Sequence, residues 1–157
     1  MLSVCEGGSV ITLDQVETRD NLRVVSDIGS RLPIYCTSQG KVFLAHMSRT
    51  SAEALLRAQH MTQFTPHTIT DLTALMQEID LCRANGYAIE NGEYKIGLRS
   101  ISAPVYTVEG KARYTVGVIG MFRSTRSDEF LAAVEQVCAT ASMISTALGY
   151  RKTEELL

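Results

Sequence analysis

Residues 32–43 read LPIYCTSQGKVF, and they raise the question of what a turn of small residues before a Gly-Lys pair does in this chain. Pro33 restricts the residue before it to an extended conformation, so a strand-like segment leads into the stretch. Small polar residues then precede a Gly-Lys pair, and the apolar residues after that pair recur near helical spacing. The pattern predicts a turn followed by a helix that begins near Ser38 and ends before Ser48.

Two interpretations of this turn are open. The case for a phosphate-binding loop is weak, because GxxxxGK[ST] requires more glycine and a hydroxyl where Val42 stands. A loop of small residues at a helix N-terminus can present free N–H groups to a carboxylate. In the simpler interpretation, Thr37 and Ser38 only cap the helix. In either case the side chain of Lys41 is expected to be solvated beyond the turn.

The surrounding segments predict a mixed fold. Before the turn, residues 2–5 and 9–16 flank Glu6-Gly7-Gly8, a hairpin signal, and residues 21–26 alternate apolar and polar side chains as a third strand would. After it, the expected elements are a short helix capped at Thr50, a helix over 69–82 that Thr68 or Thr70 caps and Gly86 ends, strands over 97–106 and 114–121, and a helix from Ser127 to Gly149. Together these elements predict an α+β domain with a largely antiparallel sheet.

Composition limits the class of protein. The chain has 157 residues, 45% hydrophobic and 20% charged, as expected for one globular domain. The net charge is −2 and no run of basic residues occurs, which argues against a nucleic-acid surface within this chain. No apolar stretch is expected to approach the roughly 20 residues that cross a bilayer, and the N-terminus lacks the pattern of a signal peptide. A cytoplasmic protein without a membrane partner is therefore predicted.

The reactive residue types form no catalytic or metal motif. The four cysteines lack a CxxC pair and the three histidines stand apart, so neither a metal nor another cofactor is expected. Cys36 is expected to be a packed thiol, since a catalytic Cys-His pair needs a proximity that the sequence does not show. Residues 90–100, ENGEYKIGLRS, hold a second group of polar side chains. Glu90 and Glu93 there could bind a hydroxylated ligand or form a solvated loop.

Four stretches occur in an order and spacing that resemble a known family. They are GSRLPIYCTSQGKVFLA (29–45), FTPHTIT (64–70), RANGYAIENGEYKIGLRSISAPVYTVEGK (83–111) and STALGY (145–150). Together they resemble the C-terminal effector-binding domain of the isocitrate lyase regulator (IclR) family of bacterial transcription factors. The resemblance runs nearly from end to end of the chain.

The resemblance implies a GAF-like (profilin-like) curved antiparallel sheet flanked by helices, with a cavity for small organic acids. It implies a single effector-binding domain over residues 1–157, slightly truncated at its N-terminal edge, without the winged helix-turn-helix domain that family members carry. It also implies a homodimer or homotetramer that reaches operator DNA only through that other domain.

Positions of the ligand site follow from the same resemblance. The small-residue turn corresponds to Ser38 and Gln39, whose backbone amides would face a ligand carboxylate. The acidic position after the Gly-Tyr pair corresponds to Glu90, and the polar residue that ends the GLR triplet to Ser100. The implied apolar walls are Val24, Leu32 and Leu98, with Tyr35 reaching the cavity.

Two positions depart from the family pattern. Where many relatives carry two serines on the return strand, this chain has Gly117 and Ile119. Losing both hydroxyls removes donors for a glyoxylate- or pyruvate-like ligand. Gly117 is also expected to leave room for a bulkier or less acidic molecule, such as a sugar acid or a lactone.

Three functions stand as hypotheses. The first is a ligand-sensing regulatory domain that binds a keto acid, a sugar acid or a related carboxylate without turning it over. The second is a hydrolase or thiol enzyme that uses Cys36 or Glu90, and the third is an oligomerisation module without a ligand. Because no catalytic dyad is visible, the sequence favours the first hypothesis over the second.

Overall fold

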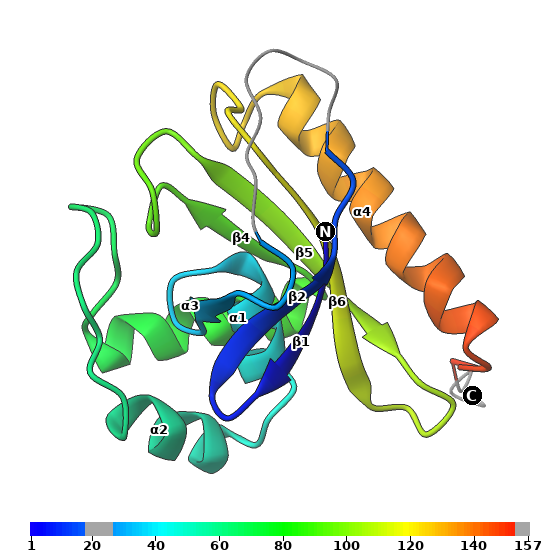
Figure 1. The fold of residues 1–157 in the computed structure, drawn as a ribbon, viewed down its shortest axis with the longest axis horizontal. Coiled ribbons are helices and arrows are strands. Elements are labelled where there is room, and N and C mark those ends of the chain that lie inside the picture. Colours follow the sequence, from blue (N-terminus) through cyan, green and yellow to red (C-terminus); the bar gives the residue numbers. More distant parts are fainter. Residues whose placement is uncertain (18–26, 153–157) are drawn as a thin grey trace.

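The computed structural model describes residues 1–17 and 27–152, which form one sheet with helices on both faces (Figure 1). The sheet has the order β3-β2-β1-β6-β5-β4 and is antiparallel throughout. Its strands are β1 (Leu2–Glu6), β2 (Ser9–Asp14), β3 (Arg31–Pro33), β4 (Ala88–Asn91), β5 (Arg99–Tyr106) and β6 (Ala112–Gly120). The helices are α1 (Ser38–Ala45), α2 (Arg49–Arg57), α3 (Leu72–Asn85) and α4 (Asp128–Ala147).

The N-terminal hairpin joins the middle of the sheet. β1 pairs with β2 on one side and with β6 on the other, where Ser3 lies opposite Thr115. Gly7 and Gly8 link the two strands with φ of 57° and 74°, a conformation that disfavours any residue with a side chain. The expected hairpin is confirmed, whereas the strand expected over residues 21–26 lies outside the described residues.

Two hydrophobic cores lie on opposite faces of the sheet. The larger one packs α1, α2 and α3 against one face; its fully buried members include Val10, Ile34, Leu44, Leu56, Leu75 and Ile79. The smaller one packs α4 against β5 and β6, and its buried members are Ile101, Ala103, Val105, Phe130, Val137 and Ala141. The α+β class with helices flanking an antiparallel sheet is therefore confirmed.

The helix ends agree with the sequence at some positions and differ at others. Ser127 caps α4 and Gly86 ends α3 with φ of 78°, both as expected. The cap of α2 is Ser48, whose Oγ accepts a hydrogen bond from the Ser51 amide at 3.1 Å, and the expected cap at Thr50 is wrong. The cap of α3 is Asp71 rather than Thr68 or Thr70. The observed caps lie close to the expected ones. Several hydroxyl or carboxylate residues lie near the start of each helix, and any of them fits the capping pattern.

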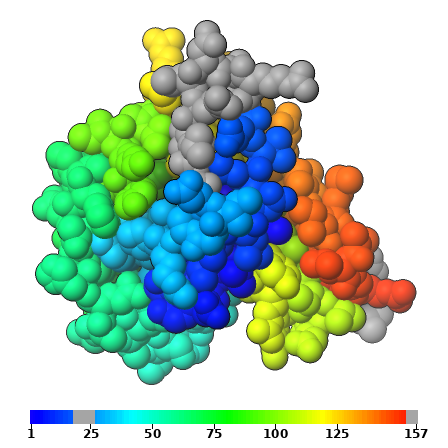
Figure 2. All heavy atoms as spheres, in the orientation of Figure 1, coloured from blue at the N-terminus to red at the C-terminus, as the bar shows by residue number. Residues whose placement is uncertain are grey.

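In the described residues, α4 is the one helix whose length and composition would allow it to cross a membrane, with a mean hydropathy of 1.3. The expectation that no apolar stretch approaches 20 residues is therefore wrong for α4. One such helix is weak evidence for a membrane span, because helices that pack on a protein core pass the same test. Here α4 packs against β5 and β6 of the sheet, and Figure 2 shows part of it (orange to red) at the molecular surface.

Candidate functional site

The turn before α1 fixes the N-terminus of this helix inside the molecule. Thr37 Oγ1 accepts a hydrogen bond from the Gly40 amide at 3.2 Å and donates one to the Pro33 carbonyl at 2.7 Å. Ser38 and Gln39 follow it and are 0% and 4% exposed. Thr37 thus acts as a cap, as the simpler interpretation has it. The first-turn amides of α1 nevertheless lie in the interior, where the helix dipole favours a negative group.

A buried carboxylate lies on the face of the sheet that α1 covers. Glu90 of β4 is 2% exposed and lies opposite Ser100 of β5. Ser100 Oγ donates to Glu90 Oε2 at 3.1 Å, and the amides of Glu93 and Tyr94 donate to Oε1 at 2.5 and 3.2 Å. Burial raises the pKa of Glu90 in spite of these donors. The carboxylate therefore offers a hydrogen-bond acceptor in the interior and disfavours a second negative charge beside it.

Ser102 joins α1 to the sheet at a position that sequence reasoning did not identify. Its hydroxyl lies 2.8 Å from that of Ser38, and both residues are fully buried. Gly117 lies opposite Ser102, and a Cβ on Gly117 would overlap Ser102 Oγ. The room expected at Gly117 is therefore already filled, by a hydroxyl supplied from the neighbouring strand. The alternation of Ser100 and Ser102 along one face of β5 was the available signal.

Replacing Gly117 with Ser is expected to lower the free energy of unfolding by about 1–3 kcal/mol, the usual cost of overpacking an interior. The added Cβ would overlap Ser102 Oγ and would lie 2.5 Å from the Ile101 carbonyl oxygen. Urea denaturation measures the change. The double variant Gly117→Ser/Ser102→Gly should recover only part of the loss, because the contact with Ile101 remains. A Gly117→Ser protein as stable as the parent would contradict this packing.

Lys41 is fully buried, so the expectation of a solvated side chain is wrong. Its Nζ lies 2.6 Å from Glu93 Oε1, 3.3 Å from the Ile89 carbonyl and 3.7 Å from Glu78 Oε2. Thr68 Oγ1 donates to the Glu93 carbonyl at 2.6 Å and so holds the turn after β4 in place. The sequence did not reveal this environment because only the tertiary fold brings that turn over α1.

Three of the side chains expected near the ligand are described by the structure, and all three are partly buried. Ile119 lies opposite Ser100 and is partly buried. Leu32 in β3 is partly buried against the larger core. Leu98 is also partly buried, and its carbonyl accepts the Gly92 amide at 2.9 Å. Val24 lies outside the described residues.

Tyr35 and Cys36 are packed into the interior. The hydroxyl of Tyr35 donates to the Thr62 carbonyl at 2.9 Å. Cys36 is 0% exposed, and burial raises its pKa to about 12, so the thiol stays protonated at neutral pH and is a poor nucleophile. Among the described residues, no group of three or more His, Cys, Asp or Glu is placed to hold a metal ion.

Comparison of this chain with known proteins identifies its family. Residues 1–146 match the family described as bacterial transcriptional regulator IclR C-terminal. The HTH-type transcriptional repressor AllR of Escherichia coli K12 is 27% identical over 96% of this chain and 55% of its own length. The HTH-type transcriptional regulator BhcR of Paracoccus denitrificans is 30% identical over 96% of this chain and 54% of its own length. The chain thus spans about half the length of these curated relatives.

A solved structure that resembles this chain supports the same family assignment. The crystal structure of the transcriptional regulator RHA06195 from Rhodococcus sp. RHA1 matches with a TM-score of 0.88 and 28% identity, covering 94% of this chain and 60% of that one. The likeness confirms the expected curved antiparallel sheet with flanking helices. The matched proteins are transcriptional regulators and not enzymes.

Proposed function

Because the chain belongs to the C-terminal domain family of the bacterial IclR transcriptional regulators, we propose that it is the ligand-sensing part of such a regulator, with its effector held between α1 and the sheet. The observation that carries this proposal is the buried carboxylate of Glu90 beside the buried hydroxyls of Ser38, Ser100 and Ser102. Burying a carboxylate is costly, and such groups concentrate at functional sites.

The chemistry of the site favours a hydroxylated acid as the effector. The first-turn amides of α1 would receive the ligand carboxylate, and Glu90 would accept a hydrogen bond from a ligand hydroxyl. Since Glu90 disfavours a second carboxylate beside it, the charge of the ligand belongs at the α1 end. A sugar acid supplies both groups, whereas a keto acid such as pyruvate offers Glu90 no hydroxyl. We therefore place sugar acids ahead of keto acids.

The same proposal extends to the whole regulator. The curated relatives are HTH-type regulators, and this chain matches about half of their length, so we propose that a DNA-binding domain outside this chain contacts the operator. Effector binding would change how two such domains are held, in a cytoplasmic homodimer or homotetramer. An oligomerisation module without a ligand is the alternative.

Thermal unfolding with gluconate and with pyruvate, at equal ionic strength, tests the proposal. Gluconate is expected to raise the Tm more, and a ligand at a hundred times its Kd adds about 2.7 kcal/mol of stability. Ser100→Ala and Glu90→Gln should reduce this shift, whereas the exposed controls Ser51→Ala and Glu109→Gln should keep it. A Tm that neither acid changes would favour the oligomerisation module.

A further inference from the structure

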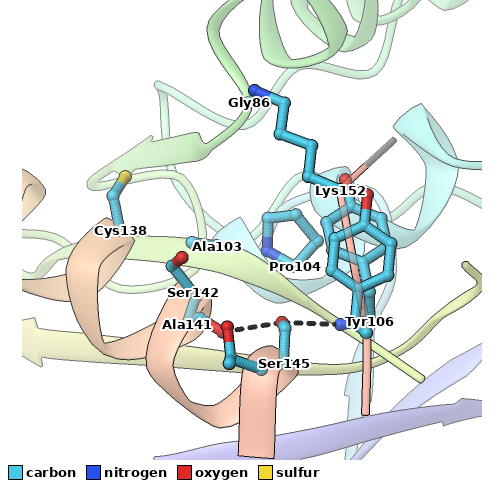
Figure 3. Close-up of a pocket in the computed structure, with 11 residues that line it drawn as sticks. Gly86, Ala103, Pro104, Tyr106, Cys138, Ala141, Ser142, Ser145 and Lys152 are labelled. Atoms are coloured by element: carbon cyan, nitrogen blue, oxygen red, sulfur yellow. Dashed lines mark hydrogen bonds between the residues drawn. The ribbon is translucent and has the colours of Figure 1, made fainter. Parts of the chain in front are cut away.

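A cavity of about 300 Å³ lies where β5 extends beyond β4 (Figure 3). β4 pairs only with the Arg99–Ser102 half of β5, so in the described chain the Ala103–Tyr106 half has no β4 partner. The C-terminal half of α4 and Tyr150 line the resulting gap. The residues of the proposed effector site at α1 do not line this cavity; they are Ser38, Gln39, Glu90, Ser100 and Ser102.

The open edge of β5 is protected against the addition of another strand. Pro104 has no N–H group to donate. The Tyr106 amide donates to Ser145 Oγ at 2.9 Å, and that hydroxyl donates to the Ala141 carbonyl at 2.7 Å (Figure 3). An added strand would find no free amide at these two positions of β5. The cavity therefore suits a small molecule better than a peptide strand.

The lining combines an apolar floor, aromatic rings, hydroxyls and one charge. The rings of Tyr106 and Tyr150 stack with centroids 4.8 Å apart and an interplanar angle of 24°. The side chain of Lys152 extends toward Gly86 (Figure 3), and it is the only charged side chain among the described residues of the lining. The apolar and hydroxyl groups come from Ala103, Pro104, Ala141, Ser142, Ser145 and Thr146.

We propose that this cavity is a second ligand site, for a small aromatic monocarboxylate. The aromatic ring would lie against Pro104 and the paired tyrosines, because aromatic rings favour such contacts. The carboxylate would lie toward Lys152 and the Ser142 hydroxyl, the positive and donor groups at the rim. The volume is at the lower end of the range of small-molecule sites, which fits a single ring. This proposal does not depend on the effector site at α1.

Benzoate is the probe, and its neutral counterpart is benzyl alcohol. In a titration followed by backbone amide NMR, benzoate is expected to shift the signals of Tyr106, Ser145 and Tyr150 saturably, with an affinity in the roughly millimolar range of a nine-atom ligand. Benzyl alcohol should bind more weakly, because it lacks the charge. Shifts confined to Ser38, Ser100 and their neighbours would overturn the proposal, as would the lack of saturation below about 20 mM.

Substitutions in and near the cavity test where benzoate binds. Ser142→Trp fills the cavity from an exposed position on α4 and should weaken benzoate binding more than about tenfold, whereas Thr140→Trp, at a nearby exposed position outside the lining, should not. Lys152→Met should weaken benzoate by about threefold, the scale of an exposed ion pair, without affecting benzyl alcohol. Glu90→Gln should leave benzoate binding unchanged. Equal affinity in the Ser142→Trp and Thr140→Trp proteins would contradict the site.

Discussion

Replacing Lys41 with Met is expected to lower the free energy of unfolding by about 3–5 kcal/mol at pH 7.5, the usual cost of removing one partner of a buried ion pair. Lys41 is 0% exposed and its Nζ lies 2.6 Å from Glu93 Oε1. Without the ammonium group the Glu93 carboxylate would remain charged in the interior, where its Oε2 already has no hydrogen-bond partner among the described residues. Urea denaturation measures the loss.

The loss should depend on pH. Burial raises the pKa of Glu93, and Lys41 acts against that rise. In the variant the folded-state pKa of Glu93 therefore rises further. A carboxyl with a raised folded-state pKa stabilises the protein below its unfolded-state pKa and loses that contribution as the pH rises through the folded-state value. The deficit of the Lys41→Met protein should therefore be smaller at pH 5, where Glu93 is more protonated, than at pH 7.5.

Two further variants separate the buried charge from a general loss of packing. Lys41→Met/Glu93→Leu should recover most of the stability, because an apolar pair of similar volume needs no compensating charge. Lys111→Met removes an exposed lysine 3.7 Å from Glu109 and should change stability by less than about 0.5 kcal/mol. A deficit that is equal at both pH values would show that the charge of Glu93 is not its cause.

Gly40→Ala is expected to lower the free energy of unfolding by more than about 3 kcal/mol, beyond the common range for overpacking. A Cβ on Gly40 would overlap the Ile34 carbonyl oxygen and would lie 2.5 Å from the carbon of that carbonyl, and both are backbone atoms that cannot rotate away. A loss of stability would be informative, because alanine is otherwise favoured over glycine inside a helix by about 1 kcal/mol. Thermal and urea unfolding measure the effect.

Gly86→Ala is the comparison for this variant. Gly86 has φ of 78° and no neighbouring atom within 4 Å of an added Cβ, so its replacement involves only backbone strain, about 1–2 kcal/mol. Gly40→Ala should be clearly the more destabilising of the two. If the two variants lose the same stability, the close approach of α1 to Ile34 is not what requires glycine at position 40.

The amino-acid sequence alone was enough to predict several turns and helix ends. Hydrophobic periodicity and turn residues predicted the hairpin at Gly7-Gly8, the start of α1 at Ser38, the end of α3 at Gly86 and the cap of α4 at Ser127. These features depend on residues close together in the chain, so the sequence contains the information for them. The order of four motifs also indicated the family, which the match over residues 1–146 supports.

The tertiary structure decided what each polar side chain meets. Lys41 was expected in solvent and lies in the interior, because the turn that carries Glu93 covers α1. Gly117 was expected to leave space, yet Ser102 fills it from the neighbouring strand. The strand β4 was not expected, since its four residues are too few to show a period. In each case the partner is distant in sequence, and the pairing of strands and helices alone sets which distant groups share the interior.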